Sequence, residues 1–202
     1  IVPDVADEVK SYVEKGGTVL VIPESFIFDQ YGREADKISE FGIGIKDVTL
    51  PEAIRSEEKK QNYDQSFSKP VIYGKIRSKI TVHPEDIFSG KKLVSEIYSD
   101  GLKQSIDPGS GKVIAEFEDG KPAIVVVHSG KGSLYYLAAP LEPEYYHFLF
   151  SLLARKTGVN QPVTAVDSAG NLITGAEVRA VERKNDFLAY ASNLTSRTLE
   201  FD

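Results

Sequence analysis

Apolar side chains recur at three- and four-residue steps over the first fifteen or so residues of the chain. Charged and polar residues separate them, and this pattern is typical of an amphipathic helix. Pro3 suits the first turn of such a helix, and the pair Gly16-Gly17 predicts its end just past Lys15. The apolar stripe of this helix consists of Val2, Val5, Val9, Tyr12 and Val13.

A continuous apolar run, Thr18–Ile22, follows the two glycines directly. A run without polar alternation predicts a strand that is buried on both faces of a parallel sheet. A helix, a glycine stop and a buried strand together form half of a β-α-β unit. The strand that should precede the helix is missing, and the chain does not begin with Met. We therefore expect the chain to be a piece of a longer protein.

Between residues 71 and 127 the hydrophobic period changes to two, which predicts antiparallel strands. Before this region, residues 41–45 predict a tight turn into a short strand. The charged segment 52–69 predicts a surface loop or a short exposed helix. A buried hairpin is predicted over residues 123–137, with its turn at Ser129–Gly132.

The clearest helix in the sequence follows Pro140 and ends at Gly158. Its polar side carries His147, Ser151 and Arg155, which we expect to face solvent. Its apolar stripe consists of Tyr145, Phe148, Leu149, Leu152 and Leu153.

A second section begins near Val159, and nothing in it has a helical period. We predict an α/β layered domain over residues 1–158 and a small antiparallel β-domain over residues 159–202. An exposed joint at residues 160–162 should connect them. The four strands predicted in the second domain cover residues 163–166, 176–182, 187–192 and 198–201.

Composition removes several classes of function. The chain has 24 Lys and Arg against 30 Asp and Glu, a net charge of −6, which argues against nucleic acid as a partner. Apolar runs are only a few residues long, so no membrane segment is predicted. There is no Cys, which excludes disulfides and thiolate sites. His83, His128 and His147 have no metal-ligand spacing, and we predict no metal or cofactor. These features leave the cellular compartment open.

Two glycine-rich segments superficially resemble phosphate-binding loops, Gly109–Lys112 and Gly130–Ser133. A P-loop needs the pattern G-x-x-x-x-G-K-[ST] between a strand and a helix. Neither segment has the first glycine at the required distance, and both lead into strands, so they predict hairpin turns. The sequence also contains no G-x-S-x-G elbow for a nucleophilic serine. We therefore predict no catalytic residue in this chain.

Glu24 is the most suggestive single residue, because it directly follows the predicted parallel strand. Open α/β sheets place their ligand sites at the carboxyl ends of strands, and Ser25 and Asp29 stand close by. We take these three residues as ligand-binding candidates. The alternative is structural, since acidic residues on such loops are also common as helix or turn caps.

Two segments resemble class I glutamine-amidotransferase-like domains. Residues 12–20 resemble their segment "yVe-x-GGtlv", and residues 130–137 resemble their later hairpin "GkGrvyYl". The helix that ends at Thr157-Gly158-Val159 matches their closing "ll…Gv". Together these segments are most similar to the non-catalytic trimerisation domain of glycoside hydrolase family 42 β-galactosidases. Residues 177–193 resemble the small C-terminal β-domain of that family.

This resemblance implies a flavodoxin-like or amidotransferase-like layered domain, incomplete at its N-terminus, followed by a small β-domain. It implies an accessory or oligomerisation module of a larger carbohydrate-active enzyme, with self-association and an upstream catalytic domain of the same polypeptide as partners. Genuine amidotransferases use a Cys, which this chain lacks. Two alternatives stay open: an independent carbohydrate- or ligand-binding module, and an amidotransferase-like enzyme with a replaced nucleophile.

Overall fold

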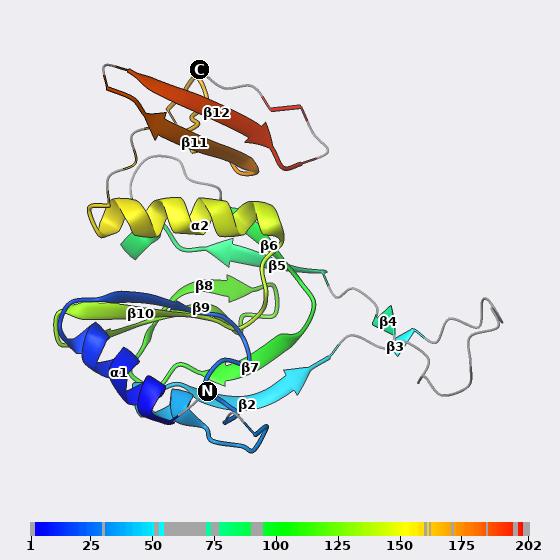
Figure 1. The fold of residues 1–202 in the computed structure, drawn as a ribbon. Coiled ribbons are helices and arrows are strands. Elements are labelled where there is room, and N and C mark those ends of the chain that lie inside the picture. The colour runs from blue at the N-terminus through cyan, green and yellow to red at the C-terminus, as the bar shows by residue number, and fades with distance from the viewer. Residues whose placement is uncertain are drawn as a thin grey trace, which may run out of the picture.

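The main element of the fold is a six-stranded mixed sheet in the order β1-β10-β9-β8-β5-β6 (Figure 1). The structure, a computed structural model, describes residues 3–29, 31–50, 53–54, 72–73, 77–89, 95–159, 161, 163–170, 172–184, 186–195 and 198–199. Strand β1 runs parallel to β10, and the other pairs in this sheet are antiparallel. The strands are β1 (Thr18–Val21), β5 (Arg77–Val82), β6 (Glu96–Asp100), β8 (Lys112–Phe117), β9 (Pro122–Ser129) and β10 (Gly132–Leu137).

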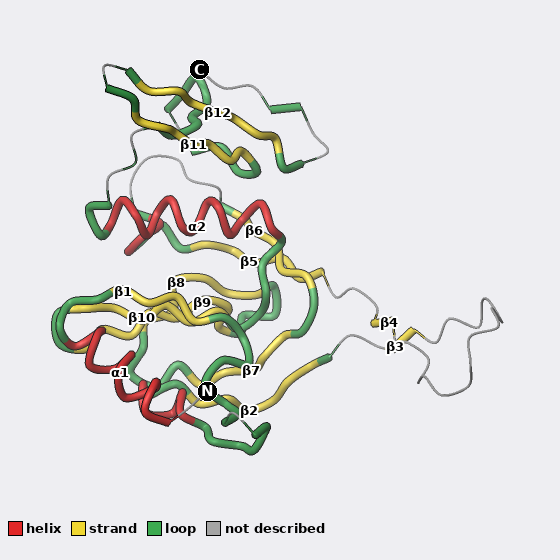
Figure 2. The backbone as a smooth tube through the Cα atoms, viewed as in Figure 1, coloured by secondary structure: helices red, strands yellow, loops and turns green. Residues whose placement is uncertain are grey.

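Three two-stranded antiparallel sheets complete the described strands: β2 (Gly44–Thr49) with β7 (Lys103–Asp107), β3 (Ala53–Ile54) with β4 (Ile72–Tyr73), and β11 (Ala176–Glu182) with β12 (Phe187–Asn193). The helices are α1 (Pro3–Glu14) and α2 (Pro143–Lys156), with short 3-10 helices η1 (Lys37–Phe41) and η2 (Asp86–Phe88). Figure 2 shows α1 on one side of the curled sheet and α2 on the other, beneath β11 and β12. The chain is thus an α/β protein, while its flavodoxin-like layering stays a prediction.

Helix α1 confirms the predicted amphipathic helix, but its buried stripe differs from the expected one. Ala6 and Val13 are buried, whereas Val5 and Tyr12 are exposed. Residues seven positions apart share one helix face, and that face packs on the sheet. The ring of Tyr12 lies instead over Gly17, where a side chain would collide with it.

The hairpin of β9 and β10 is confirmed, and every residue of β10 is buried. Its turn packs against the end of α1, where the Lys131 N–H donates to the Glu14 carbonyl at 3.1 Å. A side chain at Gly132 would collide with the carbonyl oxygens of Val13 and Gly17. The glycines of this turn therefore allow close backbone packing, which confirms the hairpin interpretation over a phosphate loop.

Strand β1 is parallel to β10 as predicted, but it is not buried on both faces. Residues 18–20 are half-buried, and Ile22 just beyond the strand is 49% exposed. In the described part of the chain, β1 has a hydrogen-bonded neighbour on one side only. It is an edge strand there, and this leaves its outer edge accessible.

Helix α2 confirms the predicted apolar stripe, since all five of its residues are buried. Gly158, with φ 72°, ends the helix in the left-handed region that favours glycine. The predicted polar side was only partly right. His147 and Ser151 are half-buried because the segment around β11 packs over them.

In the C-terminal section, β11 and β12 confirm two of the four predicted strands. The strand predicted at 163–166 is wrong: the structure has a single bridge there, between Val166 and Leu172, around a turn. Residues 198–199 are not in a strand. The rest of the 198–201 prediction, most of the charged segment 52–69, and residues 160 and 162 of the joint lie outside the described residues.

Candidate functional site

The loop after β1 carries all three predicted site residues, and Glu24 and Ser25 lie at the carboxyl end of the only parallel strand pair in the described sheets. Glu24 is exposed and Ser25 is half-buried. Ser25 N–H donates to the Ile22 carbonyl at 3.3 Å and closes a turn. Glu24 and Phe26 both have positive φ, 64° and 67°, which is uncommon for residues other than glycine. Phe26 is buried and packs edge-to-face on Phe41, so it anchors this strained loop.

Asp29, the third predicted site residue, has a visible structural task. One of its carboxylate oxygens accepts hydrogen bonds from the backbone N–H groups of Tyr31 at 2.8 Å and Arg33 at 2.9 Å. Its own N–H donates to the Arg33 carbonyl at 2.8 Å. Asp29 therefore closes the tip of the loop, as side chains of this type do in turns.

A buried polar pair lies within the electrostatic reach of Glu24. The Tyr136 hydroxyl donates to Gln104 Oε1 at 2.6 Å, and both residues are fully buried. Burial, with a further contribution from the charge of Glu24, raises the pKa of Tyr136 well above its usual range. Gln104 Nε2 is buried and has no hydrogen-bond partner among the described residues. Tyr136 is thus fixed as a protonated donor rather than available as a base.

A second cluster, which the sequence analysis missed, surrounds Asp86 at the start of η2. The hydroxyl of Tyr135 and the ammonium of Lys156 both donate to Asp86 Oδ1, at 2.6 and 2.7 Å. His128 Nε2 lies 3.8 Å from Asp86 Oδ2, and His128 Nδ1 lies 2.9 Å from Ser133 Oγ. The cluster joins η2, the β9–β10 hairpin and the last turn of α2. Its residues come from η2, β9, β10 and α2, which are separate in the sequence, so no local sequence pattern predicts the cluster.

The charges in this cluster are fixed by its geometry. Burial acts to raise the pKa of Asp86, but the hydrogen bonds from Lys156 and Tyr135 outweigh it and hold the pKa below its ordinary value. Burial and the neighbouring Asp86 carboxylate raise the pKa of Tyr135 far above its usual range. Asp86 is therefore ionised and Tyr135 protonated near neutrality, and neither is poised for proton transfer there.

The trio Ser133, His128 and Asp86 resembles a nucleophilic triad only in composition. A catalytic serine must be reachable by substrate, and it needs backbone N–H donors aimed at the developing oxyanion. Ser133 is 7% exposed, and its own N–H donates to the Gly17 carbonyl at 3.1 Å. Ser133 and His128 are cross-strand partners next to the turn of the β9–β10 hairpin, and Asp86 faces them from η2. Its geometry supports a structural clamp.

The described part of the chain contains no group of three or more His, Cys, Asp or Glu residues that could hold a metal ion. His83 instead lies between two carboxylates, 3.2 Å from Glu116 and 3.7 Å from Glu85. None of the helices described is long and apolar enough to span a bilayer.

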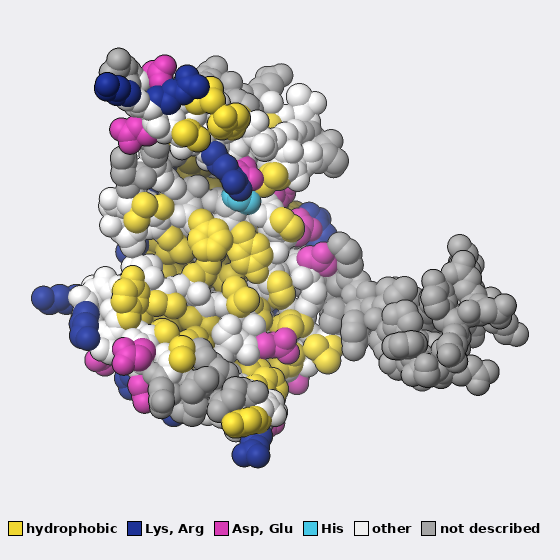
Figure 3. All heavy atoms as spheres, in the orientation of Figure 1, with side chains coloured by type: hydrophobic (Ala, Val, Ile, Leu, Met, Phe, Trp, Pro, Cys, Tyr) yellow, Lys and Arg dark blue, Asp and Glu magenta, His cyan; other side chains and the backbone are white. Residues whose placement is uncertain are grey.

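Exposed apolar side chains are the most extensive surface feature. Figure 3 shows hydrophobic side chains gathered over the face that runs from the level of α2 down toward α1. The loop after β1 exposes Tyr31 by 73% and Phe28 by 41%, in addition to Ile22. The other large exposed apolar residues in the described ranges are Val5, Tyr12, Leu50, Phe150, Val159, Val181, Leu188, Tyr190 and Leu194.

Several solved structures resemble this chain over nearly its whole length. A β-galactosidase from Bacillus circulans sp. alkalophilus matches 96% of it with a TM-score of 0.64 and 17% sequence identity. A β-galactosidase from Rahnella sp. R3 matches 97% with a TM-score of 0.66 and 14% identity. A GH42 β-galactosidase from G. stearothermophilus matches 96% with a TM-score of 0.60 and 16% identity.

The match has two limits. This chain spans about a quarter of the length of these β-galactosidases, from 25% to 26%. At such low identity the likeness shows a shared fold and carries no residue roles. No protein-family model and no curated protein sequence matches the chain.

Proposed function

We propose that this chain is a non-catalytic accessory and self-association module of a larger carbohydrate-active enzyme of the β-galactosidase type. In this proposal residues 1–158 form an amidotransferase-like α/β unit, and residues 159–202 form a small β-unit. The catalytic domain belongs to the same polypeptide. The observation that carries the proposal is the fold likeness, which covers 96–97% of this chain and the same share, about a quarter, of each β-galactosidase.

The chemistry of the two polar clusters supports an accessory role. One carboxylate oxygen of Asp86 and one of Asp29 accept internal hydrogen bonds, and Tyr135 and Tyr136 are held as protonated donors. Catalysis needs a nucleophile, or an acid and a base with pKa values suited to proton transfer. Neither described cluster offers such a group.

The surface supports self-association. Large exposed apolar patches on a protein mark sites of contact with other molecules. Among the described residues β1 is an edge strand, and the loop that follows it exposes Ile22, Phe28 and Tyr31. An unpaired strand edge next to apolar side chains favours contact with another polypeptide segment.

Light scattering and an activity assay on the 202-residue chain test this proposal together. We expect one defined oligomer, a trimer if the resemblance extends to assembly, with no hydrolysis of a nitrophenyl galactoside. Ile22→Glu should shift the oligomer toward monomer. The matched control is Val181→Glu, because Val181 is similarly exposed, 52% against 49%, but lies on β11. A monomer that hydrolyses the substrate would refute both halves of the proposal.

A further inference from the structure

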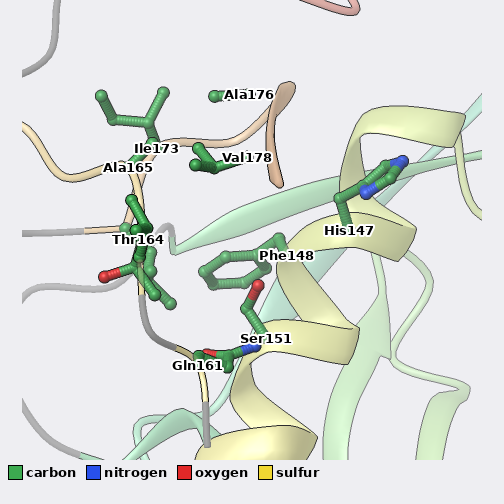
Figure 4. A pocket seen from close by; sticks show the side chains of 11 residues that line it. His147, Phe148, Ser151, Gln161, Thr164, Ala165, Ile173, Ala176 and Val178 are labelled. Atoms are coloured by element: carbon green, nitrogen blue, oxygen red, sulfur yellow. The ribbon is translucent and has the colours of Figure 1, made fainter. Parts of the chain in front are cut away.

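A cavity of about 70 Å³ lies between α2 and the segment that leads into β11 (Figure 4). This is several times the ~10–15 Å³ that admit one water molecule, so a small organic molecule fits. Helix α2 forms one wall and residues 163–165 and 172–173 form another. Ala176 and Val178 on the inner face of β11 close the top.

One polar group that lines this cavity is a hydrogen-bond acceptor without a donor. Gln161 Oε1 is buried and has no hydrogen-bond partner among the described residues. A buried acceptor without a donor is unfavourable, and the cost is relieved when a ligand donor reaches it. Figure 4 shows the Gln161 amide and the Ser151 hydroxyl at the same end of the cavity. A ligand hydroxyl can donate to Gln161 Oε1 and accept from Ser151 at once.

The remaining walls limit the ligand's charge and shape. The Phe148 ring, 3% exposed, forms the floor beside Ser151, and Leu172 and Val178 add aliphatic surface. No Lys, Arg, Asp or Glu is among the described residues that line the cavity, and His147 is their one titratable group. A charged ligand would lose hydration there without gaining a counter-charge.

We infer that this cavity binds a small neutral alcohol or polyol. The ligand hydroxyl donates to Gln161 Oε1 and accepts from the Ser151 hydroxyl, and its carbon skeleton packs on Phe148. The bound molecule contacts both α2 and β11, so binding holds the C-terminal β-unit on the helix. Such a site is independent of the proposed accessory role.

An NMR titration of the full chain with propan-2-ol and, separately, with acetone tests the inference. The two probes have nearly the same shape, but only the alcohol can donate a hydrogen bond. We expect saturable amide shifts with propan-2-ol, confined to residues around the cavity, with a millimolar dissociation constant. Acetone should bind roughly tenfold more weakly, the factor that corresponds to one hydrogen bond to a buried acceptor.

Variants separate this site from general solvent effects. Gln161→Met keeps the side-chain length and removes the acceptor, so it should abolish the preference for the alcohol. Ser151→Ala should weaken both probes, whereas Ser192→Ala on β12 should change neither. Equal binding of the two probes, tighter binding of acetone, or shifts that never saturate would each overturn the inference.

Discussion

The Asp86 cluster allows a quantitative test of what stabilises this fold. Replacing Asp86 by Ala removes the acceptor for two donors, the Tyr135 hydroxyl and the Lys156 ammonium. The Tyr135 side chain is fully buried, so its hydroxyl would lose its charged acceptor and keep only the neighbouring Ser133 side chain as a partner. We expect Asp86→Ala to be among the more destabilising substitutions outside the apolar core.

Three contributions set the size of this effect. A buried hydroxyl that loses its acceptor costs about 1–3 kcal/mol. Loss of the ion pair adds at most ~1 kcal/mol, because the Lys156 side chain is 34% exposed and water screens it. Asp86 has φ 51°, and Ala tolerates this left-handed conformation less well than Asp. The free energy of unfolding should therefore fall by roughly 2–4 kcal/mol.

A double-mutant cycle in urea, followed by circular dichroism, isolates the Asp86–Tyr135 interaction. Tyr135→Phe alone should cost ~1 kcal/mol, and the double variant should cost less than the sum by about 1–2 kcal/mol, because no hydroxyl then lacks its acceptor. Tyr136→Phe is the control. Tyr136 is the next residue but donates to Gln104, so its effect should add to that of Asp86→Ala within ~0.5 kcal/mol. Additivity of the Asp86 and Tyr135 substitutions would refute the reasoning.

Acidification should weaken the same cluster. The pKa of Asp86 is lower in the folded protein than its ordinary value of 3.8, so the unfolded chain binds more protons in this range. The stabilisation is fully present above the unfolded pKa and is lost as the pH falls through the folded pKa. The stability difference between the wild-type chain and Asp86→Asn should therefore stay level from pH 7 to about pH 5 and shrink as the pH falls below about 4. A constant difference would contradict this assignment.

Three further predictions concern two backbone positions and the joint between the two predicted domains. Gly132→Ala should lower the free energy of unfolding by more than ~2 kcal/mol, because the added side chain meets backbone oxygens. Gly120→Ala has open space around it and should cost only the ~1 kcal/mol that its positive φ imposes. Urea titration of both variants measures these costs. Glu24→Gly should stabilise by up to ~1 kcal/mol, since glycine accepts φ 64° without strain, and thermal unfolding would show the gain. Limited proteolysis should cut near residues 160–162 or in the charged segment 52–69, and preferential cutting within 123–137 would contradict the observed core.

Hydrophobic periodicity predicted the buried residues best in elements with a strong local pattern. The stripe of α2 and the hairpin of β9 and β10 have strong local patterns, and the structure confirms both. Strand β8 shows the limit of such patterns. Ile114 and Ala115 are neighbours on this strand and both are fully buried, because β8 lies inside a sheet that has α1 on one side and α2 on the other. Burial of both faces depends on elements distant in the chain, which a single strand's sequence does not describe.

The candidate sites could be predicted only in part. Glu24 and Ser25 do lie at the carboxyl end of a parallel strand, as the order of elements suggested. Asp86 could not be found this way, because its partners lie 49 and 70 residues further along the chain. The cavity at Gln161 was missed for a related reason. It exists because residues 161–178 cover the side of α2 that the polar pattern assigned to solvent.

Backbone strain at Phe26 and Asp86 is tied to anchoring rather than to exposed chemistry. Strain at a functional site persists because the surrounding structure holds it, so the contacts of each strained residue indicate its purpose. Phe26 is held by burial against Phe41, and Asp86 is held by Tyr135 and Lys156. In both cases the side chain of the strained residue makes the contacts that attach a loop or 3-10 turn to the main body of the fold. In the proposed self-association module, such anchoring would keep the loops in position while their apolar tips face another molecule.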